Sequence, residues 1–511
     1  MNLMMLLEMA AGAYGDRVAF QNGDERLTYQ ELFEAAGALA ASLDDGRTQH
    51  LAMLDESSLA LPIGVFGASW AGVPFAPLNY RLTDAELDSL ISQLHPGRLV
   101  TDSERAARLG DRLLSPDGGD AYVEVGTRDA MLSAVRGKGA GRSDATWSME
   151  PEDTAILLFT SGTTGAPKAA VLRQKHLVSY VLGTVEFMSA EETDASLNCV
   201  PPYHIAGMAA IASSVYSGRR VVQLPAFTSA GWLETARREN VTHAFVVPTM
   251  LARIVDELEG EKDARLPSLR ALSYGGGKMP QSVIERAMRL FPDCNFTNAY
   301  GLTETSSTIS LLGPEEHREA MSSADEAVRR RIVSVGRPLP TIEVSIRDAD
   351  DLSPLPAGER GLIHVRGEQV SGEYRGKGSL LDDEGWFNTR DGGYLDDEGY
   401  LFLEGRMDDV IVRGGENMSP GEIEDVLLEH ASVADAAVVG VPDEQWGEAV
   451  AAVIVLKAEA EASVAELQQW VKDRLRSSRT PERIEFWPEL PYNETGKLLR
   501  RKVREALRDS D

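Results

Sequence analysis

Helical periodicity and short apolar runs alternate along the first 300 residues. Thr28 with Glu31, and Thr83 with Glu86, have the spacing of capping boxes, and leucines and alanines follow on one face of the first helix. The apolar, small-residue segment 59–72 predicts a packed helix. Strand–helix alternation of this kind indicates parallel sheets covered by helices. The predicted strands are 50–55, 98–102, 155–160, 243–248 and 269–277.

The pattern changes after about residue 330. Residues 342–348 and 361–367 predict strands separated by proline and glycine turns. The sequence DDEG followed by an aromatic residue occurs twice, at 382–386 and 396–400, and predicts two hairpin turns. It lacks the ligand spacing of a calcium loop. We therefore expect a small β-rich subdomain.

The last hundred residues change again. Helical segments at 421–430 and 464–475 enclose predicted strands at 435–441 and 449–457, which indicates a small α+β domain. The polar run GRMDD at 405–409 is the candidate boundary. We thus predict an α/β protein whose large N-terminal domain, of two α/β subdomains plus the β-rich one, covers residues 1–406. The C-terminal domain covers residues 407–511.

Composition and charge exclude several classes of function. The 511 residues contain 51 Lys and Arg against 80 Asp and Glu, a net charge of −29. Such acidity argues against nucleic-acid binding, and an anionic substrate would need a local exception. The only cysteines, Cys199 and Cys294, exclude a disulfide framework and fit a reducing compartment. With no basic leader and no apolar stretch of about 18 residues, we expect a cytoplasmic protein without an integral membrane segment.

The most informative segment is LLFTSGTTGAPKAA, residues 157–170. Here an apolar strand runs into a loop in which glycines let backbone N–H groups approach phosphate, hydroxyls add donors and a lysine adds charge. The spacing is not that of a Walker A motif, and an ordinary turn is the alternative. The candidate phosphate-binding residues are Thr160, Ser161, Gly162, Thr163, Thr164, Gly165 and Lys168.

TSGTTGAPK resembles the phosphate loop of the adenylate-forming enzymes, which include acyl- and aryl-CoA synthetases, firefly luciferase and peptide-synthetase adenylation domains. Five further segments match in the family's order, and six ordered matches argue against chance. They are PPYHIAG (201–207), SYGGGKMP (273–280), NAYGLTET (298–305), the long segment 389–424 and PYNETGK (491–497). Two positions depart from the family: Ala169 replaces a usual glycine, and SSRTPER (477–483) lacks a usual lysine.

The resemblance implies a two-step reaction. A carboxylate attacks the α-phosphorus of ATP, pyrophosphate leaves, and a thiol then displaces AMP from the acyl-adenylate. No protein nucleophile is needed, so the enzyme works by positioning and by stabilising charge. The resemblance also implies that the C-terminal domain caps the site and is mobile, rotating about Asp408 between the half-reactions.

The resemblance assigns roles residue by residue. Lys497 would bridge carboxylate and phosphate, Thr303 would bind the α-phosphate, and Glu304 would hold Mg2+. The acid pocket would include His204 and Gly207, and for His204 an ordinary core histidine is the alternative. The remaining nucleotide contacts would be Gly275, Gly276, Gly277, Asn298, Ala299, Tyr300, Gly301, Asp391 at the ribose and Arg406. Coenzyme A would pass Arg413, Gly414 and Gly415.

The substrates implied are ATP, coenzyme A and a small carboxylic acid. Amino-acid-activating members place an aspartate near position 204, and this chain has none there; it also ends soon after the lysine motif. Both features favour a free-standing acid–CoA ligase, for a hydrophobic, aromatic or alicyclic acid or a medium-chain fatty acid. The alternatives are an adenylating enzyme that loads a carrier protein and a non-catalytic nucleotide-binding regulator. The sequence leaves a homodimer open.

Overall fold

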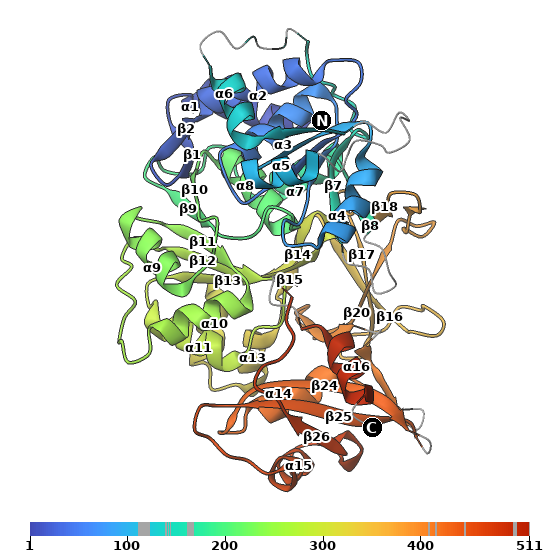
Figure 1. The fold of residues 1–511 in the computed structure, drawn as a ribbon. Helices are drawn as coiled ribbons and strands as arrows, with labels where there is room; N and C mark the ends of the chain where they lie inside the picture. Colours follow the sequence, from blue (N-terminus) through green and yellow to red (C-terminus); the bar gives the residue numbers. More distant parts are fainter. Residues whose placement is uncertain are drawn as a thin grey trace.

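The computed structural model describes residues 1–110, 123–137, 141, 143, 145–160, 168–406, 409–413, 416–443, 446–493 and 498–509. In Figure 1 two large sheets with their helices occupy the top and middle of the molecule, and a small C-terminal domain lies at the bottom. The predicted fold class is confirmed: an α/β N-terminal part with a β-rich subdomain, followed by a small α+β domain.

The first sheet has eight strands in the order β19-β18-β8-β7-β4-β3-β5-β6. The neighbours β7, β4, β3, β5 and β6 pair in parallel. The pairs β7–β8, β8–β18 and β18–β19 are antiparallel. The strands are β3 (Leu51–Leu54), β4 (Phe75–Pro77), β5 (Gly97–Thr101), β6 (Val123–Thr127), β7 (Thr154–Thr160), β8 (Lys168–Arg173), β18 (Glu373–Tyr374) and β19 (Gly378–Ser379).

The second sheet has nine strands in the order β15-β14-β13-β12-β11-β9-β10-β1-β2. Its inner strands are parallel, as predicted, and both edges are antiparallel. The strands are β1 (Val18–Asn22), β2 (Glu25–Thr28), β9 (Ala195–Asn198), β10 (Arg220–Gln223), β11 (His243–Val246), β12 (Ala271–Gly275), β13 (Asn295–Leu302), β14 (Ser307–Leu312) and β15 (Arg337–Pro338).

Helices cover both sheets, and one continuous apolar cluster joins them. The predicted capping box opens α2: the Thr28 hydroxyl accepts from the Glu31 N–H at 3.1 Å, and the Glu31 carboxylate accepts from the Thr28 N–H at 2.8 Å. The helices are α1 (Leu3–Tyr14), α2 (Tyr29–Leu43), α3 (Ala60–Ala71), α4 (Asp84–Ile91), α5 (Ser103–Gly110), α6 (Arg128–Arg136), α7 (Gln174–Thr184), α8 (Ile205–Ser217), α9 (Ser229–Arg238), α10 (Pro248–Glu257), α11 (Gln281–Leu290), α12 (Pro314–Ser322) and α13 (Glu326–Arg330).

The β-rich subdomain is a four-stranded antiparallel sheet in the order β16-β17-β20-β21. Both DDEG segments form the predicted turns in the same way: Asp382 and Asp396 each accept two backbone N–H groups, from the residues two and four positions later. The strands are β16 (Glu343–Arg347), β17 (Gly361–Arg366), β20 (Phe387–Leu395) and β21 (Leu401–Arg406).

The C-terminal domain has a separate five-stranded sheet. Four strands lie in the order β23-β22-β25-β24, and β26 pairs with β25. Lys278 reaches it from the N-terminal domain, 2.5 Å from Asp425. The division at 406 and 407 stays a prediction. The elements are β22 (Ile411–Arg413), β23 (Glu416–Met418), α14 (Pro420–Leu428), β24 (Val433–Asp443), β25 (Gly447–Leu456), α15 (Val464–Lys472), β26 (Arg483–Phe486) and α16 (Arg500–Asp509).

Two further findings concern the helices and the cysteines. None of the helices in the described part of the chain combines the length and apolarity needed to cross a membrane. Cys199 and Cys294 are both buried free thiols.

Candidate functional site

The candidate nucleotide site begins where β12 and β13 end. Gly276 and Gly277 follow β12 and are exposed, whereas Gly275 and Gly301 lie against neighbouring backbone. A Cβ at Gly275 would meet the Ala299 carbonyl oxygen at 2.1 Å, and one at Gly301 would meet the Ser307 oxygen at 1.8 Å. Gly275 and Gly301 are therefore required by strand packing, whether or not a nucleotide binds.

β13 leads into the single 3₁₀ turn η2 (Thr303–Thr305), which carries Thr303 and Glu304. Buried Asn298 on β13 donates its side-chain N–H to the Ser334 carbonyl at 2.9 Å. This bond ties β13 to the segment that contains Ser334. Glu304 follows in η2, after the strand has ended. The Glu304 backbone oxygen accepts from Ser371 and Gly372 at 2.8 and 3.0 Å.

A tyrosine holds the side chain of Glu304. The Tyr374 hydroxyl donates to Glu304 Oε1 at 2.5 Å and lies 3.4 Å from the hydroxyl of Thr160. Thr160 ends β7, Glu304 lies in η2 and Tyr374 lies in β18, so three distant segments converge on one carboxylate. Sequence reasoning found Thr160 and Glu304 but missed Tyr374. The sequence holds no signal for it, because the two-residue strand β18 has no periodic pattern and pairs with β8 about 200 residues earlier.

The strand after the phosphate loop is joined to that hairpin. The backbone N–H of Arg375 donates to the Ala169 oxygen at 2.9 Å. The Arg173 guanidinium donates two hydrogen bonds of 2.8 Å to the Glu373 carboxylate. Ala169, one of the two departures from the family motif, is buried within this pairing. The neighbouring Lys377 and the more distant charge of Arg390 lower the pKa of Lys168. Lys168 therefore lies in a locally cationic environment.

Asp391 lies on β20, mostly buried, with Arg406 as its backbone partner on β21. One of its bonds is from the Tyr300 hydroxyl, 2.6 Å from Asp391 Oδ2. The structure thus brings together two predicted nucleotide-binding residues, Tyr300 and Asp391, through a contact that the sequence did not indicate. The preceding Arg390 has a left-handed backbone, with φ at 61°.

His204 stands just before α8, whose first turn contains Gly207. Burial lowers the pKa of the imidazole to about 4, so it is neutral at physiological pH. Its buried Nε2 has no hydrogen-bond partner within the described residues, and its ring lies 4.6 Å from that of Tyr203. A buried polar atom left in this way requires an explanation, and a ligand group at this position would supply one.

Several predicted residues lie outside the described part of the chain: Ser161, Gly162, Thr163, Thr164, Gly165, Asp408, Gly414, Gly415 and Lys497. The residues flanking Lys497 are anchored. Tyr492 pairs with Leu498 in an antiparallel bridge and donates to Asp435 at 2.8 Å. After the lysine motif, half-buried Arg500 binds both oxygens of Glu424.

Arg413, predicted to border the path of coenzyme A, is engaged within the C-terminal domain. Its guanidinium donates to the Ser478 oxygen at 3.1 Å and pairs with Glu482. Both partners belong to SSRTPER, the segment that lacks the usual lysine. The role of Arg413 toward coenzyme A stays a prediction.

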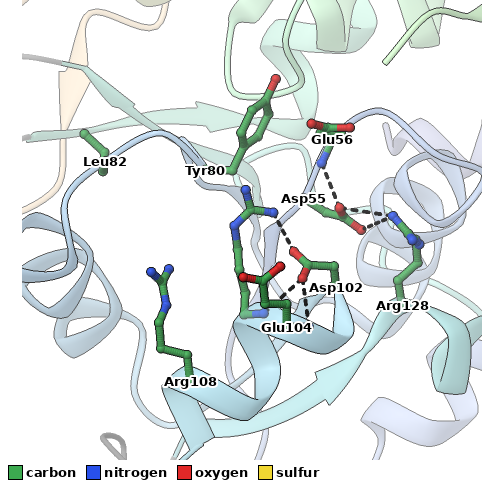
Figure 2. Close-up of a pocket in the computed structure, with 9 residues that line it drawn as sticks. Asp55, Glu56, Tyr80, Leu82, Asp102, Glu104, Arg108 and Arg128 are labelled. Atoms are coloured by element: carbon green, nitrogen blue, oxygen red, sulfur yellow. Dashed lines mark hydrogen bonds and ion pairs between the residues drawn. The ribbon is translucent and has the colours of Figure 1, made fainter. Parts of the chain in front are cut away.

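The structure also has a pocket of 470 Å³ at the carboxyl ends of β3, β5 and β6 (Figure 2). Its residues include none of the predicted site residues, and its arginines pair with carboxylates: Arg128 with Asp55 at 3.0 Å, Arg105 with Asp102 at 2.5 Å and Arg108 with Asp84 at 3.3 Å. Tyr80 forms part of its wall, and its ring lies 5.5 Å from that of Tyr203 beside His204.

Two α/β sheets, a small C-terminal domain and a carboxylate held beside the phosphate-loop strands define a nucleotide-dependent enzyme of two domains. The chain belongs to the AMP-binding enzyme family. The model of that family matches residues 7–375, and the model of the AMP-binding enzyme C-terminal domain matches residues 422–497. The resemblance to adenylate-forming enzymes is confirmed.

Named relatives match along nearly the whole chain. The 2-succinylbenzoate–CoA ligase of Bacillus licheniformis is 33% identical over 508 residues, 97% of this chain and 98% of that protein. A fatty acid–[acyl-carrier-protein] ligase, ScoC, of Streptomyces coeruleorubidus is 30% identical over 94% of this chain and 92% of its own length.

A solved structure is similar in fold. The o-succinylbenzoate CoA synthetase (MenE) of Bacillus subtilis, in complex with its acyl-adenylate intermediate, is 29% identical with a TM-score of 0.82. The match covers 98% of this chain and 97% of that chain. The same synthetase has also been solved with ATP and a magnesium ion.

Proposed function

We propose that the protein is an ATP-dependent carboxylic acid–coenzyme A ligase whose acid is aromatic. The observation that carries this proposal is the Thr160–Tyr374–Glu304 cluster beside Lys168, at the edge where the family binds its nucleotide. The relatives that act on 2-succinylbenzoate, an aromatic acid, support the substrate class and the acceptor.

In the first step, a carboxylate oxygen of the acid forms a bond to the α-phosphorus of ATP. The bond from that phosphorus to the bridging oxygen breaks, and pyrophosphate leaves with the bridging oxygen. In the second step, the sulfur of coenzyme A, having lost its proton, forms a bond to the acyl carbon. The bond from that carbon to the phosphate oxygen then breaks, and AMP leaves.

Each residue in this proposal binds or orients; none attacks the substrate. Glu304 would hold Mg2+, Lys168 and the loop 160–165 would bind the β- and γ-phosphates, and Asp391 would bind the ribose. Lys497 would offset the repulsion between the carboxylate and the phosphate in the first step only.

The residues present fit a magnesium ion. Mg2+ binds through one or two carboxylates, substrate phosphates and water, and Glu304 supplies one carboxylate in a fixed orientation. Among the described residues no cluster of three metal-ligating side chains occurs, which suits a metal that arrives with ATP. When bound, the ion neutralises phosphate charge.

His204 supports an acid pocket at the start of α8. Its neutral imidazole adds no repulsion or fixed charge toward the acid, and its unbonded Nε2 is positioned to meet a polar group. Four of the six residues that follow, in IAGMAA (205–210), are alanine or glycine, which leaves room for a bulky acid. The buried free thiols Cys199 and Cys294 support a cytoplasmic location.

A second candidate function replaces coenzyme A with a carrier protein. It is favoured by the fatty acid–[acyl-carrier-protein] ligase, whose identity to this chain is only slightly lower. Both candidates share the adenylate-forming step and differ in the thiol that receives the acyl group.

A two-stage assay tests the proposal. Exchange of labelled pyrophosphate into ATP, measured with a panel of aromatic, alicyclic and fatty acids, should depend on an aromatic acid. Coenzyme A should then release AMP in amounts equal to the acyl-CoA formed. Exchange without release of AMP on adding coenzyme A would favour the carrier-protein alternative, and no exchange with any acid would favour a regulator.

A further inference from the structure

A lysine that follows the glycines at the end of β12 joins the N-terminal domain to the C-terminal domain. Lys278 stands between exposed Gly277 and Met279, which is buried in the core of the second sheet. Its ammonium lies 2.5 Å from Asp425 Oδ1 and donates to the Gly421 carbonyl oxygen at 3.3 Å. Lys278 therefore binds helix α14 at two places.

The start of α14 also contacts strand β21. The Ser419 hydroxyl donates to the carbonyl oxygen of Glu404. A Cβ at Gly421 would lie 3.3 Å from that same oxygen and 3.4 Å from the Lys278 ammonium. Two segments of the N-terminal domain, one after β12 and one in β21, thus hold the same end of one helix.

The residue beside Asp425 on α14 holds the segment that follows the lysine motif. Buried Glu424 accepts two hydrogen bonds from the Arg500 guanidinium, at 2.7 and 2.5 Å. Arg500 comes three residues after Lys497, and three residues of chain span at most about 11 Å. Neighbouring carboxylates of α14 therefore connect the lysine motif to the end of β12.

The segment predicted to border coenzyme A is open to solvent in this arrangement. The side chain of Val412 is 47% exposed, and that of Trp446 is 44% exposed. The Arg413 guanidinium lies over the Trp446 ring, 5.2 Å from its centroid. The contact through α14 therefore leaves this part of the C-terminal domain uncovered while it places the lysine motif near the nucleotide end of the second sheet.

We propose that Lys278 and Asp425 are positioning residues for the first half-reaction. Their ion pair holds α14, and with it the lysine motif, beside the end of β12. The inference rests on the proposed function, in which Lys497 acts in the first step only. Both side chains are about half exposed, so the pair shifts the docking equilibrium modestly and does not lock it.

The first experiment separates positioning from nucleotide binding. Lys278→Met should lower the kcat of acid-dependent pyrophosphate exchange about fivefold, the upper end for a partly exposed ion pair, and leave the KM for ATP within twofold. Lys278→Arg should restore the rate. With acyl-adenylate supplied, Lys278→Met should form acyl-CoA at the wild-type rate. Lys175→Met, which removes an exposed lysine paired with Glu152 at 2.6 Å, is the matched control and should change neither step.

A double variant tests whether the two residues act through one contact. Asp425→Asn keeps the shape of the side chain and removes its charge, so it should lose the same fivefold. Lys278→Met combined with Asp425→Asn should be no worse than either alone. A raised KM for ATP, equal losses in both half-reactions, or losses that multiply in the double variant would overturn the positioning role.

Hydrogen exchange gives a readout that needs no activity. The backbone amides of residues 419–425 should exchange about threefold faster in Lys278→Met, and at the wild-type rate in Lys175→Met. Unchanged exchange of this segment in Lys278→Met would overturn the contact itself. If the segment responds but the wild type shows no pyrophosphate exchange with any acid, the proposed function fails and the interdomain contact stands.

Discussion

Carboxylates are held in two different ways in two regions beside the first sheet. Next to β8 and β18, Glu304 accepts from the neutral hydroxyl of Tyr374. In the pocket at the ends of β3 and β5, Asp55 and Asp102 are bound by the guanidinium groups of Arg128 and Arg105. Figure 2 shows Asp55 and Arg128 pointing toward one another, and all four residues line the pocket.

The difference separates structural from functional charge. An arginine neutralises the carboxylate that it orients, so the pair can stabilise the fold but offers little charge to a ligand. A tyrosine hydroxyl orients a carboxylate and leaves its charge in place. A carboxylate that must hold a cation needs the second arrangement. The region near Glu304 therefore suits magnesium, although the pocket contains more acidic residues.

The largest expected effect comes from removing that charge. Glu304→Gln keeps the shape and the bond to Tyr374 but removes the charge that would hold the metal. We expect acid-dependent pyrophosphate exchange to fall about a hundredfold or more, with little change in thermal stability. Asp102→Asn, in the pocket, is the matched control and should retain exchange. Wild-type turnover by Glu304→Gln at limiting Mg2+ would remove Glu304 from the metal site.

In the pocket we expect the opposite: a substitution there should lower stability and leave activity unchanged. Arg128→Met removes the partner of Asp55, whose side chain is only 2% exposed, and should not change the KM for ATP. An unpaired buried carboxylate is costly, but Arg128 is partly exposed, so we expect a loss of about 1–2 kcal/mol at neutral pH. That is a fall of roughly 2–8 °C in the thermal midpoint of the domain. Impaired exchange with unchanged stability would contradict the division between the two regions.

The pH dependence of that loss has a definite sign. Burial already raises the pKa of Asp55 in the folded protein, although Arg128 opposes the rise. A raised carboxyl pKa favours folding below the pKa of the unfolded chain, and this advantage is lost as pH rises through the folded pKa. Without Arg128 the pKa rises further. The stability gap between variant and wild type should therefore widen from pH 5 to pH 8 and narrow in acid.

Much of the fold and of the site follows from local sequence. The capping box at Thr28, the two DDEG turns and the strands of the parallel sheets depend on residues a few positions apart, and the structure has them where they were predicted. The order of the family motifs likewise identified Glu304 and Asp391 as candidates, because each lies inside a long matching segment.

Long-range pairing was not predictable in the same way. Strand β18 has two residues, follows β17 in sequence and yet joins the first sheet about 200 residues from its partner β8. So short a strand has no periodicity to detect. Tyr374 reaches Glu304 only through this pairing. The antiparallel edge β1–β2, which lies beside β10, was also not predicted.

The smallest expected effect tests the tyrosine itself. Tyr374→Phe removes one neutral hydrogen bond to Glu304 while leaving the charge and the ring, so we expect a loss of about 1 kcal/mol, or roughly fivefold in exchange. Because the carboxylate becomes free to turn, the loss should appear as a higher Mg2+ requirement and should shrink at saturating Mg2+. Tyr29→Phe is the matched control: its buried hydroxyl donates to the oxygens of Ser214 and Arg219, so its loss should lower stability without changing the Mg2+ requirement. A loss of exchange in Tyr374→Phe that Mg2+ does not relieve would mean that the hydroxyl supports the hairpin fold and not the orientation of Glu304. The difference between a carboxylate bound by a tyrosine hydroxyl and one bound by an arginine would then concern stability alone.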